Sequence, residues 1–345
     1  MTRSREPLAG SVTPPSRRRV LTMIGTFAGL PLLSGAADTS ARARLYQWTG
    51  TSLGSPSRLL LYHDDRHAAA EIIDRCVAEI ERLERIFALY REESEIVRLN
   101  REGRLAAPSQ DLLLVLAHCQ RLSLLSDGAF DVSVQPLWNL YAAHFFGVAA
   151  PAPEGPAPSA IERALGLVDW RGVDLGADRV RLARRGMGLT LNGIAQGYLT
   201  DRITDILRDH GCDRVLADMG RSEMRAFGRH ADGAAWRVGL ADPRRPDNVI
   251  RTLDLTDRAL CTSGGYGTPF EPTLHHHHLF DPRTGTSAHH HLAVSVLAPS
   301  AMIADALSTA LYIVPLESAR RLLREFPRTE ALVTSADGTM SRLMS

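Results

Sequence analysis

The sequence predicts an α+β fold, with a single compact domain that follows a short N-terminal leader. Strand-like and helix-like segments mix without the regular βαβ spacing of a parallel sheet. The chain has 345 residues, 44% of them hydrophobic, so it can bury a core as one big domain or two moderate ones. A Pro/Ala-rich stretch near 149–159 is expected to be a surface loop that interrupts the domain without dividing it.

Hydrophobic periodicity predicts the elements in order along the chain. Ser57–His63 is expected to be a strand, and apolar residues recur at helical spacing over Ala68–Phe87. A second amphipathic helix should run from Ser109, a suitable N-cap, to the stop at Asp127-Gly128. Another helix follows Asn192-Gly193. The remaining pattern predicts three strands and a last helix: Val215–Met219, Ala235–Ala241, Leu292–Ala298 and Ala301–Val314.

The N-terminal region has the features of an export signal. Arg17-Arg18-Arg19 precedes the apolar run Met23–Leu33, and small residues then offer cleavage after about Ala37 or Ala43. Paired arginines in this position resemble a twin-arginine signal, which exports folded proteins. The run is too short to span a bilayer comfortably, and no cysteine lies near the cleavage region, so we expect no permanent membrane anchor. The prediction is a periplasmic protein with a leader over 1–43 and a domain over 44–345.

Composition excludes several classes of function. The formal net charge of +1 gives no argument for a nucleic-acid partner. All 40 basic residues are arginine, so Schiff-base and other lysine-dependent covalent chemistry is excluded. The cysteines lie far apart without a C-x-x-C pair, which argues against zinc ribbons and thioredoxin-type motifs and favours core packing. They are Cys76, Cys119, Cys212 and Cys261.

Asp305 is the strongest physical anomaly in the sequence. It lies in the apolar segment A-M-I-A-D-A-L-S-T-A-L-Y-I-V, where a carboxylate loses hydration that only a cation or several donors can replace. Thr309 follows four residues later, on the same helical face. Together they offer two hard oxygen ligands of the kind that Mg²⁺ binds. The alternative, equally open from spacing alone, is that Asp305 caps the helix or complements its dipole.

Two glycine-containing segments suggest ligand-binding turns. Asn192–Tyr198 is expected to turn from a strand into a helix, where free backbone N–H groups can meet a phosphate. The chain contains no G-x-G-x-x-G, so a Rossmann-type mode is not supported. Cys261–Gly265 contains Ser263 but is not G-x-S-x-G. A turn whose hydroxyl helps to hold a ligand is therefore favoured over a serine hydrolase.

Seven histidines surround an F-D-P-R-T-G turn. The i, i+2 spacing of His276 and His278 would place both on one face of a strand, as a transition-metal site requires. Adjacent histidines, however, point to alternate sides, and neither H-E-x-x-H nor a cysteine partner is present. A solvated or loop-borne cluster is therefore favoured over a dedicated zinc site. The seven are His275, His276, His277, His278, His289, His290 and His291.

Eight short segments between about Gly50 and Leu311 stand in an order typical of one family. They are G-T-S-L-G-S, L-Y-R-E-E-S-E-I-V-R-L-N, D-G-A-F-D-V-S-V-Q-P-L-W, N-G-I-A-Q-G-Y, W-R-V-G-L-A-D-P, L-C-T-S-G-G-Y, H-L-F-D-P-R-T-G and A-D-A-L-S-T-A. Together they resemble the ApbE flavin transferases, a family in which the exported NosX-like subgroup is one candidate for this chain. The resemblance implies T-fold-like mixed sheets with packed helices. It also implies an enzyme that uses Mg²⁺ and FAD to attach FMN through a phosphoester to a threonine of a target protein, releasing AMP.

The resemblance further implies roles for individual residues. Asp305, Thr309 and the carbonyl of Gly193 would hold Mg²⁺. Asp305 and His278 are the catalytic candidates. His278, which begins the H-x-x-D-P-x-T-G segment and is expected to titrate near neutrality, would be the catalytic base. Flavin contacts would fall on Leu53, Tyr90, Ala129, Phe130, Asp131, Thr190, Gln196 and Leu279.

Some positions depart from the family pattern. The usual Asp and Lys around the I-A-K-G turn are Thr190 and Gln196 here, and the usual paired glycines are Gly220-Arg221. The usual M-G-T is Leu53-Gly54-Ser55. The lost charges leave two alternatives open, an exported FAD-binding carrier without transfer activity and an FAD pyrophosphatase that gives FMN and AMP. The expected partners are FAD and a threonine-bearing protein of a membrane respiratory complex.

Overall fold

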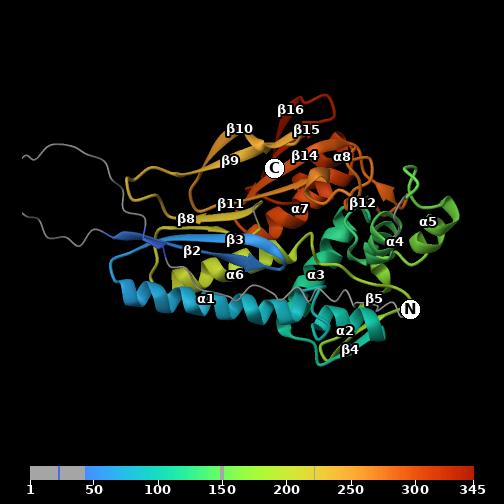
Figure 1. The fold of residues 1–345 in the computed structure, drawn as a ribbon, viewed down its shortest axis with the longest axis horizontal. Helices are drawn as coiled ribbons and strands as arrows, with labels where there is room; N and C mark the ends of the chain where they lie inside the picture. The colour runs from blue at the N-terminus through green and yellow to red at the C-terminus, as the bar shows by residue number, and fades with distance from the viewer. Residues whose placement is uncertain (1–21, 24–42, 148–150, 221) are drawn as a thin grey trace, which may run out of the picture.

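The computed structural model describes residues 22–23, 43–147, 151–220 and 222–345. Nearly all of the predicted export signal therefore lies outside the described residues. Within them, sheets and helices pack into one domain of mixed type, which confirms the α+β prediction (Figure 1). No helix in this part of the chain is long and apolar enough to cross a membrane.

A nine-stranded sheet forms the centre of the fold, and each neighbouring pair in it is antiparallel. Its order is β1-β2-β3-β7-β8-β11-β14-β15-β16, so strands from both ends of the chain meet in one sheet. The strands are β1 (Thr22–Met23), β2 (Arg44–Ser52), β3 (Ser55–His63), β7 (Val215–Asp218), β8 (Glu223–Phe227), β11 (Ala259–Gly264), β14 (His291–Ala298), β15 (Glu330–Ser335) and β16 (Met340–Met344).

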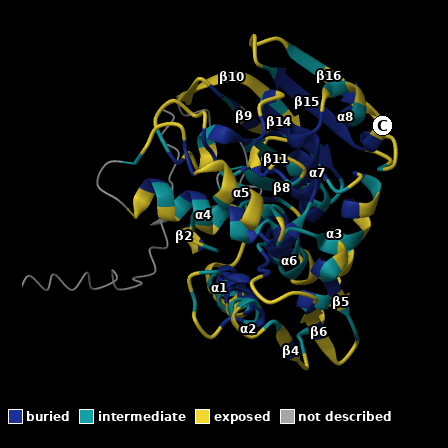
Figure 2. Ribbon diagram, turned by 90° about the vertical axis from the view of Figure 1, so that its right-hand side faces the viewer, coloured by how far each residue is buried: buried dark blue, intermediate teal, exposed yellow. Residues whose placement is uncertain are grey.

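The two faces of this sheet are covered differently. Helices α1 (Arg66–Phe87), α6 (Ala195–Asp209) and α7 (Ala301–Ile313) pack on one face and share a large apolar core with it. The ribbon of β9 (Trp236–Asp242) and β10 (Arg245–Leu255) covers the other face over a smaller core. In Figure 2 the inner strands and α7 are largely buried, whereas β10 is largely exposed. The strongest burial therefore surrounds α7.

The other elements lie around this centre. The remaining helices are α2 (Glu95–Glu102), α3 (Gln110–Leu125), α4 (Gln135–Phe146), α5 (Pro158–Leu165) and α8 (Leu316–Leu323). A small sheet contains β4 (Arg104–Ala106), β5 (Val173–Leu175) and β6 (Arg179–Leu182), and a hairpin contains β12 (Phe280–Asp281) and β13 (Thr286–Ser287). Short 3₁₀ turns are η1 (Val132–Val134), η2 (Trp170–Gly172) and η3 (Gly265–Gly267).

Most of the predicted elements are confirmed within a few residues. Ser109 caps α3, because its hydroxyl accepts the Leu112 N–H at 3.2 Å. The predicted strand before Asn192 was wrong, since the chain between β6 and α6 contains no strand. There the Asn100 side chain donates to the Leu189 carbonyl and accepts its N–H, at 2.8 and 2.7 Å. These two bonds replace the partner strand that an extended segment would otherwise need.

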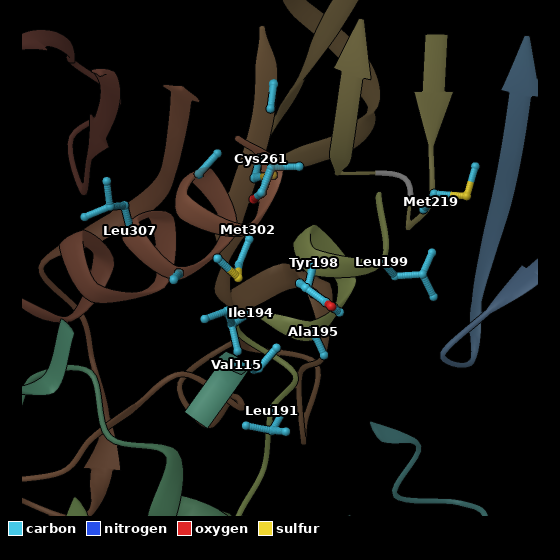
Figure 3. Close-up of a cluster of buried hydrophobic side chains, with 14 of the residues drawn as sticks. Val115, Leu191, Ile194, Ala195, Tyr198, Leu199, Met219, Cys261, Met302 and Leu307 are labelled. Atoms are coloured by element: carbon cyan, nitrogen blue, oxygen red, sulfur yellow. The ribbon is translucent and has the colours of Figure 1, made fainter. Parts of the chain in front are cut away.

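Apolar packing fixes α6 against α7. Figure 3 shows part of this core, where Met302 of α7 lies near Cys261 of β11 and Ile194 at the start of α6. All four cysteines are buried and free, which confirms the prediction of core packing. The core leaves little freedom for α6 and α7 to move apart, so polar groups between them hold fixed positions.

Candidate active site

One large cavity, of about 1380 Å³, brings the predicted site residues together. All twelve line it, although they come from six separate segments of the chain. They are Leu53, Tyr90, Ala129, Phe130, Asp131, Thr190, Gly193, Gln196, His278, Leu279, Asp305 and Thr309. The fold therefore places the residues chosen from sequence around one space.

The carboxylate of Asp305 lies where α6 crosses α7. The Gly197 N–H of α6 donates to Asp305 Oδ2 at 2.9 Å, and Asp305 is 4% exposed. A Cβ at Gly197 would lie 2.3 Å from the Ala301 carbonyl oxygen, so only glycine permits this close crossing. We call the group Gly193, Gly197, Glu223, Asp305 and Thr309 the α6–α7 corner.

Asp305 does not cap its own helix. Ser300 is the N-cap of α7, and its hydroxyl accepts the Ile303 N–H at 3.3 Å. Asp201 of α6 accepts the Ala301 and Met302 N–H groups at 2.8 and 3.0 Å. With these donors already satisfied, the capping alternative for Asp305 does not apply.

Hydroxyl groups surround Thr309 in the corner. A Cβ at Gly193 would lie 3.0 Å from Thr309 Oγ1, so the backbone of Gly193 lies close to this hydroxyl. Ser263 Oγ is 2.7 Å from Ser308 Oγ and 3.2 Å from Thr309 Oγ1. Ser263 is thus bonded to other hydroxyls, with no histidine bonded to it among the described residues. Ser263 lies on strand β11, so the predicted turn is wrong at this residue. Its hydroxyl contacts support a ligand-holding role and not a serine nucleophile.

Burial makes it unfavourable for the two carboxylates of the corner to be charged. The pKa of Asp305 is raised to about 7, chiefly because burial disfavours its charged form. Burial, and then the neighbouring Asp305, raise the pKa of Glu223 well above its usual value. Sequence reasoning missed Glu223, because one acidic residue on a strand looks like an ordinary solvent-facing position. In the structure, a Cβ at Gly220 would lie 2.1 Å from Glu223 Oε2, so this carboxylate packs directly against the Gly220 backbone.

The corner fits a hard divalent cation. Among the described residues, no three His, Cys, Asp or Glu side chains converge as a metal-binding group. The corner instead offers the desolvated carboxylates of Asp305 and Glu223 and the hydroxyl of Thr309, with the Gly193 backbone close by. Oxygen atoms of this kind are the ligands that Mg²⁺ takes while keeping several waters. A cation there would also compensate the negative charge of the buried carboxylates, which have lost their hydration.

His278 lies in the cavity wall as a neutral imidazole. Its Nδ1 is 3.2 Å from the Thr268 carbonyl oxygen, and since a carbonyl only accepts, Nδ1 carries the proton. The other ring nitrogen, Nε2, therefore keeps its lone pair. The ring is half-buried by surface area but lies deep in the wall, and burial lowers its pKa to about 4. The expectation that it titrates near neutrality is wrong for the protein without substrate.

The histidine-rich segment lies mostly on a loop, as expected, and it is only partly solvated, because His275, His289 and His290 are exposed whereas three others are buried. His276, His277 and His291 are 7%, 2% and 4% exposed. His276 and His278 do not share a strand face, because apart from one bridge at His277 the segment before β12 has no strand. In the turn that follows, Asp281 accepts the Arg283 guanidinium at 2.7 and 2.8 Å. That ion pair shapes the turn. Of the seven histidines, only His278 lines the cavity.

Comparison with known proteins identifies the family. The ApbE family profile matches residues 51–333.

The chain belongs to the ApbE family. It is 31% identical to the FAD:protein FMN transferase of Treponema pallidum over 333 residues, covering 89% of each protein. The FAD:protein FMN transferase of Salmonella typhimurium is 26% identical, again over 89% of each. Among solved structures, the ApbE protein of Thermotoga maritima superposes with a TM-score of 0.76 at 25% identity, covering 87% of this chain and 97% of that one. The flavinyl transferase ApbE of Pseudomonas stutzeri gives 0.70 at 26%, covering 88% and 96%.

Two positions that depart from the ApbE pattern, Gln196 and Thr190, have well-defined partners, as does the neighbouring wall residue Asp131, whereas Arg221 lies outside the described residues. Gln196 is 8% exposed and donates to Ser52 Oγ at 2.8 Å. Thr190 donates its N–H to the Val132 carbonyl at 2.8 Å. Asp131 accepts the Ser133 N–H at 2.7 Å and the Trp170 N–H at 3.0 Å, so its carboxylate holds η1 and η2. These side chains shape the cavity wall without adding a positive charge to it.

Proposed function

We propose that this protein transfers FMN from FAD to a threonine hydroxyl of a target protein, in a Mg²⁺-dependent reaction that releases AMP. The observation that carries the proposal is the convergence of all twelve predicted residues on one cavity. Its volume of about 1380 Å³ exceeds the roughly 300–1,000 Å³ of small-molecule pockets, so a dinucleotide and an acceptor side chain can share it. The FAD:protein FMN transferases to which the chain is similar support the same reaction.

The corner and His278 divide the chemistry between them. Asp305, Thr309 and the Gly193 carbonyl would hold Mg²⁺, which neutralises charge on a pyrophosphate. His278 Nε2 accepts the proton of the threonine hydroxyl. The threonine oxygen forms a bond to the FMN phosphorus as the pyrophosphate bond to AMP breaks, and AMP leaves with the electron pair. The negative pyrophosphate beside His278 raises its pKa from the value without substrate, which makes the neutral imidazole a better base.

A single assay separates this function from its alternatives. The protein is incubated with FAD, Mg²⁺ and a candidate target domain, and the products are resolved on a denaturing gel and by nucleotide chromatography. Transfer gives a fluorescent target band and an equal amount of AMP, and replacing the acceptor threonine by alanine removes the band. Free FMN and AMP with an unlabelled target would indicate an FAD pyrophosphatase. FAD recovered intact from the protein would indicate a carrier.

We also propose that the protein acts in the periplasm on a membrane respiratory complex. The support is the arginine pair and apolar run within residues 1–43, which are typical of twin-arginine export. Replacing Arg17 and Arg18 by lysine should retain the precursor in the cytoplasm, and fractionation measures this. Unchanged periplasmic enzyme in that variant would rule out the twin-arginine route.

A further inference from the structure

A second buried carboxylate lies behind the rim of the cavity, on the last turn of α1. Glu84 is 3% exposed and does not line the cavity. Its Oε1 accepts the Tyr90 hydroxyl at 2.9 Å and the Leu53 backbone N–H at 3.3 Å. Its Oε2 forms an ion pair with Arg91. Leu53 and Tyr90 both line the cavity, so one carboxylate joins two parts of its rim.

The turn between β2 and β3 depends on this contact. Leu53 and Gly54 have φ values of 48° and 84°, in the left-handed region. That region is unfavourable for leucine, so contacts outside the turn must hold it. A Cβ at Gly54 would lie 3.4 Å from Tyr90 Cε1, which places the turn directly against the tyrosine ring. The turn and the ring form one wall, and Glu84 is bonded to both.

Tyr90 is exposed and yet anchored. It is 58% exposed, while its hydroxyl is held by Glu84. Burial of the hydroxyl and the nearby Glu84 charge raise the pKa of Tyr90 to about 12, so it remains a hydrogen-bond donor. An exposed aromatic ring otherwise samples several rotamers, and a ligand that stacks on it must restrict them. An anchored ring has lost that freedom before the ligand arrives.

We propose that Glu84 is a positioning residue for the flavin, which fixes the Leu53-Gly54 turn and the Tyr90 ring as one wall before FAD binds. Its removal weakens FAD binding and leaves the transfer step unchanged, because Glu84 does not line the cavity. The inference rests on the proposed function only in taking FAD as the occupant of the cavity.

Binding of FAD alone, without Mg²⁺ or target, tests the inference. The Kd is measured by flavin fluorescence for Tyr90→Phe, Glu84→Gln and the double variant. Tyr90→Phe removes the anchoring bond from the other side and keeps the buried ion pair, so it remains informative even if Glu84→Gln folds poorly. One hydrogen bond is worth about 1 kcal/mol, so we expect Tyr90→Phe to raise Kd roughly 5-fold. The double variant should bind about as weakly as Glu84→Gln, since both changes break the same contact.

Glu79→Gln is the matched control. Glu79 lies on α1 like Glu84, pairs with Arg82 at 2.8 Å, and does not line the cavity. It should lower thermal stability and leave the Kd for FAD within roughly 2-fold, as expected for a purely structural ion pair. Unchanged Kd in Tyr90→Phe and Glu84→Gln, or fully additive losses in the double variant, would overturn the inference while the proposed function stands. No FAD binding by the unaltered protein, either without Mg²⁺ or with it, would overturn the proposed function as well.

Discussion

The histidine-rich segment and the α6–α7 corner differ in how many candidate metal ligands they hold and in what those ligands do. Seven histidines lie between His275 and His291, yet their rings pack against one another and against aromatic residues. His275 and His289 have ring centroids 5.0 Å apart, and His276 lies 5.1 Å from Phe145. The corner has far fewer candidates, but the Asp305 carboxylate is desolvated, and among the described residues it forms no ion pair. Unmet charge distinguishes a candidate metal site better than the number of ligands.

The largest effect should follow from neutralising the corner. Asp305→Asn removes the charge that would hold Mg²⁺, and we expect the transfer rate to fall on the order of 10³–10⁴-fold, as loss of several kcal/mol implies. Without divalent cations at pH 8 the variant should melt at a higher temperature, because a buried charge has been removed. Gel-based kinetics and calorimetry measure these two quantities.

The control for that change lies at the same helix junction. Asp201→Asn weakens the capping of α7 and should lower the melting temperature while keeping transfer within roughly 10-fold. Equal losses of activity in both variants would mean that Asp305 only positions α7. The corner would then have no better claim to be the metal site than the histidine-rich segment has.

His278→Gln asks whether one histidine of the segment takes part in the chemistry. Loss of a general base typically costs about 10²–10⁴-fold, and we expect kcat to fall by at least roughly 10² while the Kd for FAD stays nearly constant. His290→Gln, at an exposed position, should leave kcat unchanged. Single-turnover transfer measures the chemical step. A His278→Gln enzyme with normal kcat would remove this residue from the mechanism.

Thr309→Val tests the hydroxyl of the corner with little change of volume. Losing one oxygen ligand should raise the Mg²⁺ concentration for half-maximal transfer by about 10-fold, equivalent to about 1.4 kcal/mol. Thr309→Ser retains the hydroxyl and should behave like the unaltered protein. The transfer rate is measured as a function of Mg²⁺ concentration. Identical curves for Thr309→Val and the unaltered protein would argue against Thr309 as a ligand.

The last prediction concerns the stability of the histidine-rich segment in acid, which does not affect the reaction itself. Burial lowers the pKa of His277 to about 3 and also lowers the pKa values of His276, His289 and His291. Below about pH 6.5 the unfolded chain binds protons that the folded protein does not. The free energy of unfolding therefore decreases as the pH is lowered, by up to about 1.4 kcal/mol per pH unit for each such histidine. His277→Gln should reduce this slope in urea titrations between pH 6.5 and 4. An unchanged slope would show that His277 does not contribute.

Sequence patterns predicted the helices and the order of motifs because both depend on local spacing. Periodicity placed α1, α3 and α7, and the apolar surroundings of Asp305 identified it without any structure. Spacing could not show that Ser300 and Asp201 satisfy the first turn of α7, which is what excludes a capping role for Asp305. Glu84 and Glu223 escaped notice for a similar reason. Each acts through partners distant in sequence, and nothing in their neighbourhoods differs from ordinary surface positions.

The hydrogen bond between Gly197 and Asp305 joins residues 108 positions apart. During synthesis, the first of these leaves the ribosome long before the second, so a nascent chain contains most of the flavin-facing wall but not the corner. If the proposed function is correct, metal and nucleotide could therefore be held together only after α7 has folded onto α6. The enzyme becomes competent in one late step, and a chain truncated before residue 305 should fold partly and remain inactive.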